Sequence, residues 1–167
     1  FMGITAGDNN TSGDANTFMG FGAGTNNTTE SMNSYFGNFA GANSSTGTEN
    51  SFFGNHAANL MDSSNSTIFG AFASGSSGLT NATAIGHRAF VAQSNSLVLG
   101  SINGVNGASA DTNVGIGTTA PTNLLTIGVP EATTATASVG VFSTTGTNIV
   151  VRETTNDVEN IFGANST

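Results

Sequence analysis

The segment Gly115-Ile116-Gly117-Thr118-Thr119-Ala120 has the spacing of a dinucleotide-binding fingerprint. In that motif the glycines let the backbone approach a pyrophosphate at the start of a helix, and an acid about 20 residues further on binds the ribose. Here Pro121 and a strand-like stretch follow the glycines, and positions 135–140 contain no acid. We therefore expect no nucleotide site and no other cofactor.

Histidine is the residue type that most often serves as a metal ligand or as a general base. The chain has two, His56 and His87, which stand two and one residues after glycines of a repeat described below. A threefold axis could gather three copies of either one into an ion site. Because they do not share a repeat position, we interpret them as turn or surface residues and expect no metal.

Carboxylates could hydrolyse a glycosidic bond, but they would need a defined separation and a raised pKa on one member of the pair. The acids of the first two thirds of the chain are scattered over turn-like segments, and none lies in a Gly-Gly-x-Gly-x-Asp calcium repeat. We interpret them as solvated turn residues and predict that the chain is not an enzyme. They are Asp8, Asp14, Glu30, Glu49, Asp62 and Asp111.

The composition excludes several other classes of function. Only 7% of the 167 residues are charged, against about 25% in an average soluble domain. There is no lysine, and Arg88 and Arg152 are the only strong bases, so the formal charge is −8. Nucleic acid is therefore not an expected partner. The absence of cysteine excludes disulfides and thiol chemistry. The sequence contains no run of eighteen apolar residues, so we expect no membrane-spanning helix.

Two apolar residues followed by glycine recur seven times, with the glycines 17, 17, 17, 16, 16 and 14 residues apart. Six of these glycines are followed three residues later by alanine. The segments between the signatures are rich in Asn, Ser, Thr and Gly, which favour turns. A unit this short cannot bury its own apolar residues, so it must stack on its neighbours. The expected fold class is all-β, a stacked β-coil of the β-roll or β-solenoid kind.

Successive residues of a strand point to opposite faces, so Phe52 and Phe53 cannot both enter one core. One chain covers only one of these faces, and a large exposed apolar stripe is unusual for a monomer. We predict a homo-oligomer with the apolar-apolar-Gly strand inward and the Asn/Ser/Thr-rich side outward. The residues expected in the solenoid core or the trimer core are Met2, Met19, Phe36, Phe53, Phe69, Ile85, Leu99, Phe18, Tyr35, Phe52, Ile68 and Val98.

The small residues of the repeat fit a tight inner corner, where a larger side chain would force neighbouring coils apart. These residues are Gly20, Ala23, Gly37, Ala40, Gly54, Ala57, Gly70 and Ala73. The residues one or two positions after the glycines vary from coil to coil, so surface recognition is expected there. The candidates are Phe21, Phe39, His56, Phe72 and Arg88.

The Asn-Ser/Thr-apolar-apolar-Gly pattern, seen at 95–100 and 81–86, resembles the head repeats of YadA-type trimeric autotransporter adhesins. The longer coils, such as residues 50–57, are similar to repeats of phage and bacterial tail-fibre-like proteins. The resemblance covers residues 1–102. It implies a left-handed β-roll in a parallel homotrimer and a role in attachment.

The segment 113–121, with its Val-Gly-Ile-Gly-Thr-Thr-Ala-Pro run, resembles a junction motif of fibre proteins that end in a self-cleaving intramolecular chaperone. In that family a strand follows, and 124–128 fits one. We therefore expect a β-roll head at 1–112, a junction at 113–128 and a small prism-like trimeric β module at 129–167, which we interpret as truncated. Strands are expected there at 139–142, 148–153 and 158–163, with a turn at Asn156-Asp157.

The expected function is a non-enzymatic structural and adhesive segment of a trimeric extracellular fibre. Its partners would be two further copies of itself and a cell-surface glycan or protein of a host or prey cell. Two alternatives stay open. One is a tail-fibre segment that binds or depolymerises polysaccharide. The other is an ice-binding β-solenoid, which would need threonine at one repeated offset, whereas here threonine alternates with Asn, Ser and Gly.

Overall fold

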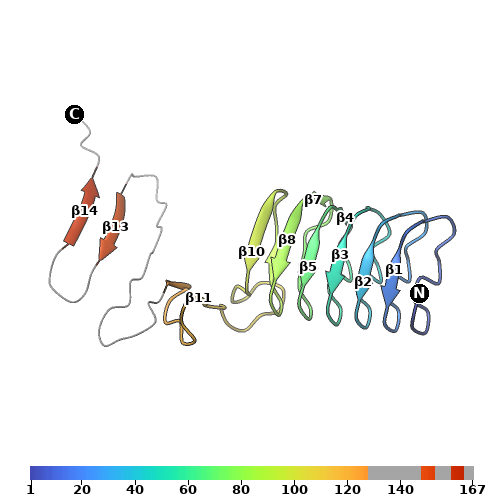
Figure 1. Cartoon of the computed structure of the whole chain (residues 1–167), viewed down its shortest axis with the longest axis horizontal. Coiled ribbons are helices and arrows are strands. Elements are labelled where there is room, and N and C mark those ends of the chain that lie inside the picture. Colours follow the sequence, from blue (N-terminus) through green and yellow to red (C-terminus); the bar gives the residue numbers. More distant parts are fainter. Residues whose placement is uncertain (128–147, 153–158, 164–167) are drawn as a thin grey trace. The chain divides into compact units, whose positions relative to one another are not determined.

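The structure is a computed structural model that describes residues 1–127 and the backbone of two strands at 148–152 and 159–163. The chain divides into two compact units, Phe1–Thr112 and Asn113–Thr167. The first unit is an all-β parallel β-solenoid of about five turns. Figure 1 shows its strands side by side along the solenoid, from β1 near the N-terminus to β10.

One sheet of six parallel strands forms the regular side of the solenoid. Its order is β1-β2-β3-β5-β8-β10, so each coil adds one strand next to the last. The register aligns equivalent repeat positions, and Tyr35 lies opposite Phe52. The first signature joins this sheet only through a bridge between Met2 and Met19. The strands are β1 (Thr17–Met19), β2 (Ser34–Phe36), β3 (Ser51–Phe53), β5 (Thr67–Phe69), β8 (Ala82–Ile85) and β10 (Ser96–Leu99).

The return side of each coil is less regular, as its Asn, Ser, Thr and Gly content predicts. In the earlier coils it consists of turns joined by backbone hydrogen bonds between coils, such as Gly24 N–H to the Ala40 carbonyl at 2.9 Å. In the later coils short parallel pairs form, β4 with β7 and β6 with β9. These strands are β4 (Ser63–Ser64), β6 (Ser74–Gly75), β7 (Leu79–Thr80) and β9 (Phe90–Val91).

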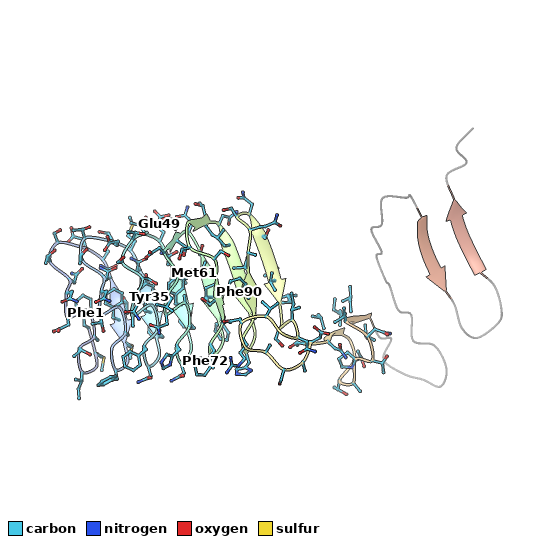
Figure 2. All side chains as sticks on the ribbon, turned by 180° about the vertical axis from the view of Figure 1, so that it is seen from behind. Phe1, Tyr35, Glu49, Met61, Phe72 and Phe90 are labelled. Carbon is cyan, nitrogen blue, oxygen red and sulfur yellow. The ribbon has the colours of Figure 1, made fainter. Side chains whose placement is uncertain are left out.

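In five successive coils the first residue of the apolar pair is buried, and together these residues form a column in the core. Phe18, Tyr35, Phe52, Ile68 and Ala84 are all at most 1% exposed. The rings stack at the spacing of the coils, with centroids 4.9 Å apart for Phe18 and Tyr35 and 4.7 Å apart for Tyr35 and Phe52. In Figure 2, Tyr35 and Met61 lie between the two edges of the solenoid, and both side chains are buried.

The repeat glycines and alanines form the corner where each main strand ends. Gly20, Gly37, Gly54 and Gly70 have φ between 136° and 142°, a region that residues with a Cβ rarely adopt. A Cβ added to Gly37 would also lie 2.6 Å from the carbonyl carbon of Gly54. Close stacking therefore requires glycine at this corner. The alanines that follow, Ala23, Ala40, Ala57 and Ala73, are fully buried.

The prediction that the Asn/Ser/Thr-rich side faces outward is wrong for three asparagines. Asn27, Asn33 and Asn50 are at most 1% exposed. Asn33 and Asn50 are buried because their amides satisfy backbone groups of the next coil where no regular sheet does so, and the Asn27 amide donates to the Glu30 carbonyl of its own coil at 2.9 Å. The Asn33 side-chain oxygen accepts a hydrogen bond from the Asn50 N–H at 3.0 Å, and the Asn50 amide donates to the Ser63 carbonyl at 2.6 Å.

The described residues of the second unit form two separate strand pairs. In the junction, β11 (Val114–Ile116) pairs in parallel with β12 (Leu125–Ile127). Further on, β13 (Asn148–Arg152) pairs antiparallel with β14 (Glu159–Gly163), where two of the three expected C-terminal strands lie. The expected strand at 139–142 and the turn at Asn156-Asp157 lie outside the described residues. Among the described residues no helix is long and apolar enough to cross a membrane.

Candidate binding surfaces

The second residue of each apolar pair points out of the solenoid, on the face of the main sheet opposite the core. We call this set the outer apolar row. Because the strands are in register, its members lie next to one another, and the Phe36 and Phe53 rings stack at 4.9 Å with an interplanar angle of 2°. Several members are widely exposed, Phe69 by 56% and Leu99 by 47%. The row is Met2, Met19, Phe36, Phe53, Phe69, Ile85 and Leu99.

A second row runs beside the first on the same face, because residues two apart in a strand share a face. It consists of hydroxyl side chains in five successive coils and changes to Leu97, which is 60% exposed, in the sixth. The outer face is thus a narrow apolar stripe flanked by small polar side chains. The hydroxyl row is Thr17, Ser34, Ser51, Thr67 and Thr83.

Aromatic and basic side chains follow the repeat glycines and form a continuous set along one edge, which we call the edge ladder. Phe39 and His56 have ring centroids 5.1 Å apart, and His56 and Phe72 stack at 5.2 Å. Figure 2 shows Phe72 at this edge and Glu49 at the opposite edge. The members of the edge ladder are Phe21, Phe39, His56, Phe72, His87 and Arg88.

Four members of the edge ladder have a left-handed backbone. Phe39, His56, Phe72 and Arg88 have φ between 52° and 57°, where glycine is usually preferred. Gly22 occupies the equivalent position one coil before Phe39, with φ 64°. This conformation follows the glycine corner and places the side chains of Phe39, His56, Phe72 and Arg88 on the same edge in four successive coils.

The edge ladder also collects the basic side chains of the solenoid. The Arg88 guanidinium lies 5.1 Å over the Phe72 ring, and His87 contacts the same ring edge-on at 6.3 Å. Arg88 also donates a hydrogen bond from Nη1 to the Asn106 carbonyl at 3.0 Å. In return, the Asn106 amide donates to the carbonyl of Phe72 at 2.6 Å, so a segment beyond the last coil holds the arginine in place.

The acids are arranged differently. Asp14, Glu30, Glu49 and Asp62 lie five to eight residues before their repeat glycines, and Figure 2 shows Glu49 at the edge opposite Phe72. Burial raises the pKa of Glu30, but hydrogen bonds from nearby backbone N–H groups outweigh it, and the net shift is downward. Glu49 therefore lies at the edge opposite the one that carries Arg88 and Phe72, whereas Asp111 accepts a hydrogen bond from the Asn103 N–H beyond the last strand.

The structure also places the other residues with chemical potential. The dinucleotide-like segment begins in β11, and among the described residues the next regular element is strand β12 rather than a helix. His56 and His87 both join the edge ladder, although their repeat offsets differ. No group of three or more His, Cys, Asp or Glu side chains within residues 1–127 is arranged to hold a metal ion.

Sequence reasoning missed two features of these surfaces. His87 stands one residue after its glycine rather than two, so counting offsets separates it from a set that it contacts in space. The buried asparagines were also not recognised, because the repeat pattern treats Asn33 and Asn65 as equivalent. Asn33 stands four residues before its glycine, whereas Asn65 stands five residues before its own. Asn65 is exposed with φ 54°, whereas Asn33 is fully buried.

No protein-family model matches the chain, and comparisons with curated proteins and with solved structures also find no match. The assignment of function therefore depends on the outer face and the edge ladder themselves.

Proposed function

We propose that residues 1–112 form the head of a homotrimeric extracellular fibre, a non-enzymatic segment that attaches to the surface of another cell. The observation that supports this most is the outer apolar row. It continues from coil to coil on a face that the chain itself leaves exposed. Burying one large apolar side chain of this kind contributes roughly 1.5–3 kcal/mol.

The shape of the row favours association about an axis parallel to the solenoid. The row is one side chain wide per coil and is flanked by serine and threonine, which allow close approach of a second backbone. Identical chains in parallel would place the Phe36 and Phe53 rings of each copy at the same height. The resemblance of the repeats to YadA-type heads and tail-fibre-like proteins favours three copies.

Sedimentation equilibrium of the full chain at micromolar concentration tests the assembly. We expect the mass of a trimer for the wild type. The variant Phe69→Asp should dissociate the assembly, because three carboxylates would meet at an apolar axis. Leu60→Asp is the matched control, since Leu60 is 73% exposed but lies outside the outer apolar row, and it should remain trimeric.

A wild-type chain that is folded by circular dichroism and monomeric at this concentration would overturn the assembly. Equal dissociation by Phe69→Asp and Leu60→Asp would show that the interface lies elsewhere. Attachment is tested separately by binding of the fluorescently labelled chain to a panel of bacterial and animal cells. Attachment to none of them would contradict an adhesive role.

A further inference from the structure

We infer that the edge ladder is a carbohydrate-binding site for an oligosaccharide that carries a single carboxylate. The inference depends on the proposed attachment function, of which it names the ligand class, but not on the number of chains in the assembly. It is carried by the aromatic contacts of the ladder, by the amides beside it and by the position of Arg88.

The ladder presents apolar surface at a regular interval along the solenoid. Its ring centroids are 5.1 to 5.2 Å apart from Phe21 to Phe72, a step similar to the advance of one pyranose unit in an extended chain. Phe21 is 46% exposed and Phe72 is 40% exposed. Because His56 stacks on Phe72 and the Arg88 guanidinium lies over the same ring, the ladder exposes ring edges rather than open ring faces. These edges can pack against the apolar C–H groups of a sugar with little loss of side-chain entropy.

Amide groups beside the ladder provide the polar contacts that sugar hydroxyls need. The Asn55 amide donates to the side-chain oxygen of Asn38 at 3.2 Å, and the Asn55 oxygen lies 2.9 Å from Nδ1 of His56. These contacts orient the amides on the same edge as the rings. A site that combines apolar surface with a few oriented polar groups has the composition of a small-ligand site.

Arg88 specifies the charged part of the ligand. The guanidinium has five N–H donors in a planar fork, and here one nitrogen donates to Asn106. The donors that remain match a carboxylate, which arginine binds in a bidentate way. Phe72 beneath the guanidinium and Asn106 beside it restrict its rotamer, so less side-chain entropy would be lost on binding.

The charge of the chain distinguishes this ligand from a polyanion. With a net charge of −8 and one arginine on the edge, the chain would repel a densely charged polymer such as nucleic acid. A sugar chain with one carboxylate needs only the one guanidinium. Glu49 lies at the opposite edge, where its charge opposes such binding least.

The test is calorimetric titration of the full chain with sialyllactose and with lactose, which differ by one carboxylate-bearing sugar. We expect sialyllactose to bind about 10 to 100 times more tightly, the range that hydrogen bonds to a charged group supply. Arg88→Lys should abolish most of this difference, because lysine keeps the charge but lacks the planar fork. Phe72→Gly should weaken binding of both sugars.

Met32→Gly is the matched control. Met32 has φ 62° and is 53% exposed, so this variant also places glycine at an exposed left-handed position, outside the edge ladder. It should bind like the wild type. Circular dichroism of each variant verifies the fold, and glycine at Phe72 fits the backbone of that position.

The inference is overturned if sialyllactose and lactose bind equally, if neither binds, or if Arg88→Lys leaves the difference intact. Tighter binding of a single-stranded DNA oligomer than of sialyllactose would also overturn it. Sedimentation of the same samples separates the two proposals. A trimer that binds no sugar contradicts only the edge ladder site, whereas a monomer that binds sialyllactose contradicts only the trimeric assembly.

Discussion

Alkaline pH should destabilise this protein through one side chain, Tyr35. It is the only tyrosine in a chain that has no lysine and no cysteine, so no other side chain titrates near pH 10. Tyr35 is 1% exposed and stacks between Phe18 and Phe52. Burial raises the pKa of its hydroxyl well above 10.0, and a hydrogen bond with the Asn50 side chain offsets this only in part.

The sign and size of the effect follow from proton linkage. Above about pH 10 the tyrosine of the unfolded chain loses its proton while the buried tyrosine keeps it, so the unfolded state binds fewer protons. The free energy of unfolding should then fall by about 1.4 kcal/mol per pH unit. A rise of two pH units above pH 10 should lower the free energy of unfolding by about 2.7 kcal/mol, a large part of the roughly 5 to 15 kcal/mol that is typical of a folded protein. Below pH 10 this residue should produce no pH dependence.

Urea unfolding followed by circular dichroism, in steps from neutral pH to about pH 12, measures this slope, and tyrosinate absorbance reports ionisation directly. In Tyr35→Phe the slope should vanish, at a cost of about 1 kcal/mol for the lost hydrogen bond. Tyrosinate formation near pH 10 in the folded chain would refute the reasoning, because it would place the hydroxyl in water. An unchanged slope in Tyr35→Phe would also refute it.

Two further predictions concern the contacts between coils. Gly37→Ala should lower the free energy of unfolding by about 2 to 6 kcal/mol, because it adds a strained φ to a contact with the carbonyl of Gly54. Gly78→Ala is the control: its φ is 80° and no atom lies within 4 Å of the added Cβ, so it should lower the free energy of unfolding by only about 1–2 kcal/mol. Urea unfolding measures both variants, and equal losses of stability would contradict the stacking argument. Asn33→Ala should lower the free energy of unfolding by about 1–3 kcal/mol, because it leaves the buried N–H of Asn50 in the next coil unpaired. Asn43 is exposed, so Asn43→Ala should lower it less. Thermal unfolding that ranks the two variants in the opposite order would show that the buried asparagines do not join the coils.

The stacked-coil architecture could be predicted because it depends on local chemistry repeated at a nearly constant interval. A pair such as Phe52 and Phe53 before Gly54 indicates a short strand with apolar residues on both faces, followed by a sharp corner. A unit of this length has no core of its own, so stacking was the remaining solution. The sequence did not show which residue of each pair faces the core, because the alternation of side chains along a strand requires only that the two residues lie on opposite faces.

The polar side of the coil was predicted less well, since hydrophobicity gives no signal for a buried amide. Asn33 and Asn65 have the same side chain and are both followed by serine, yet one is in the core and the other is on the surface. The difference is a single residue in the distance to the following glycine. It becomes visible only when the backbone of the adjacent coil supplies the hydrogen-bond partners.

The sequence alone therefore determined the repeat, the glycine corner and the presence of an apolar residue on each face of the main strand, because these properties belong to residues close together in the chain. Tertiary structure decided that Phe53 and its equivalents are the members that face away from the core. It also decided that His56, His87 and Arg88, from different coils, gather on one edge around Phe72. Such contacts depend on the register between coils, which is set by hydrogen bonds across 14 to 17 residues.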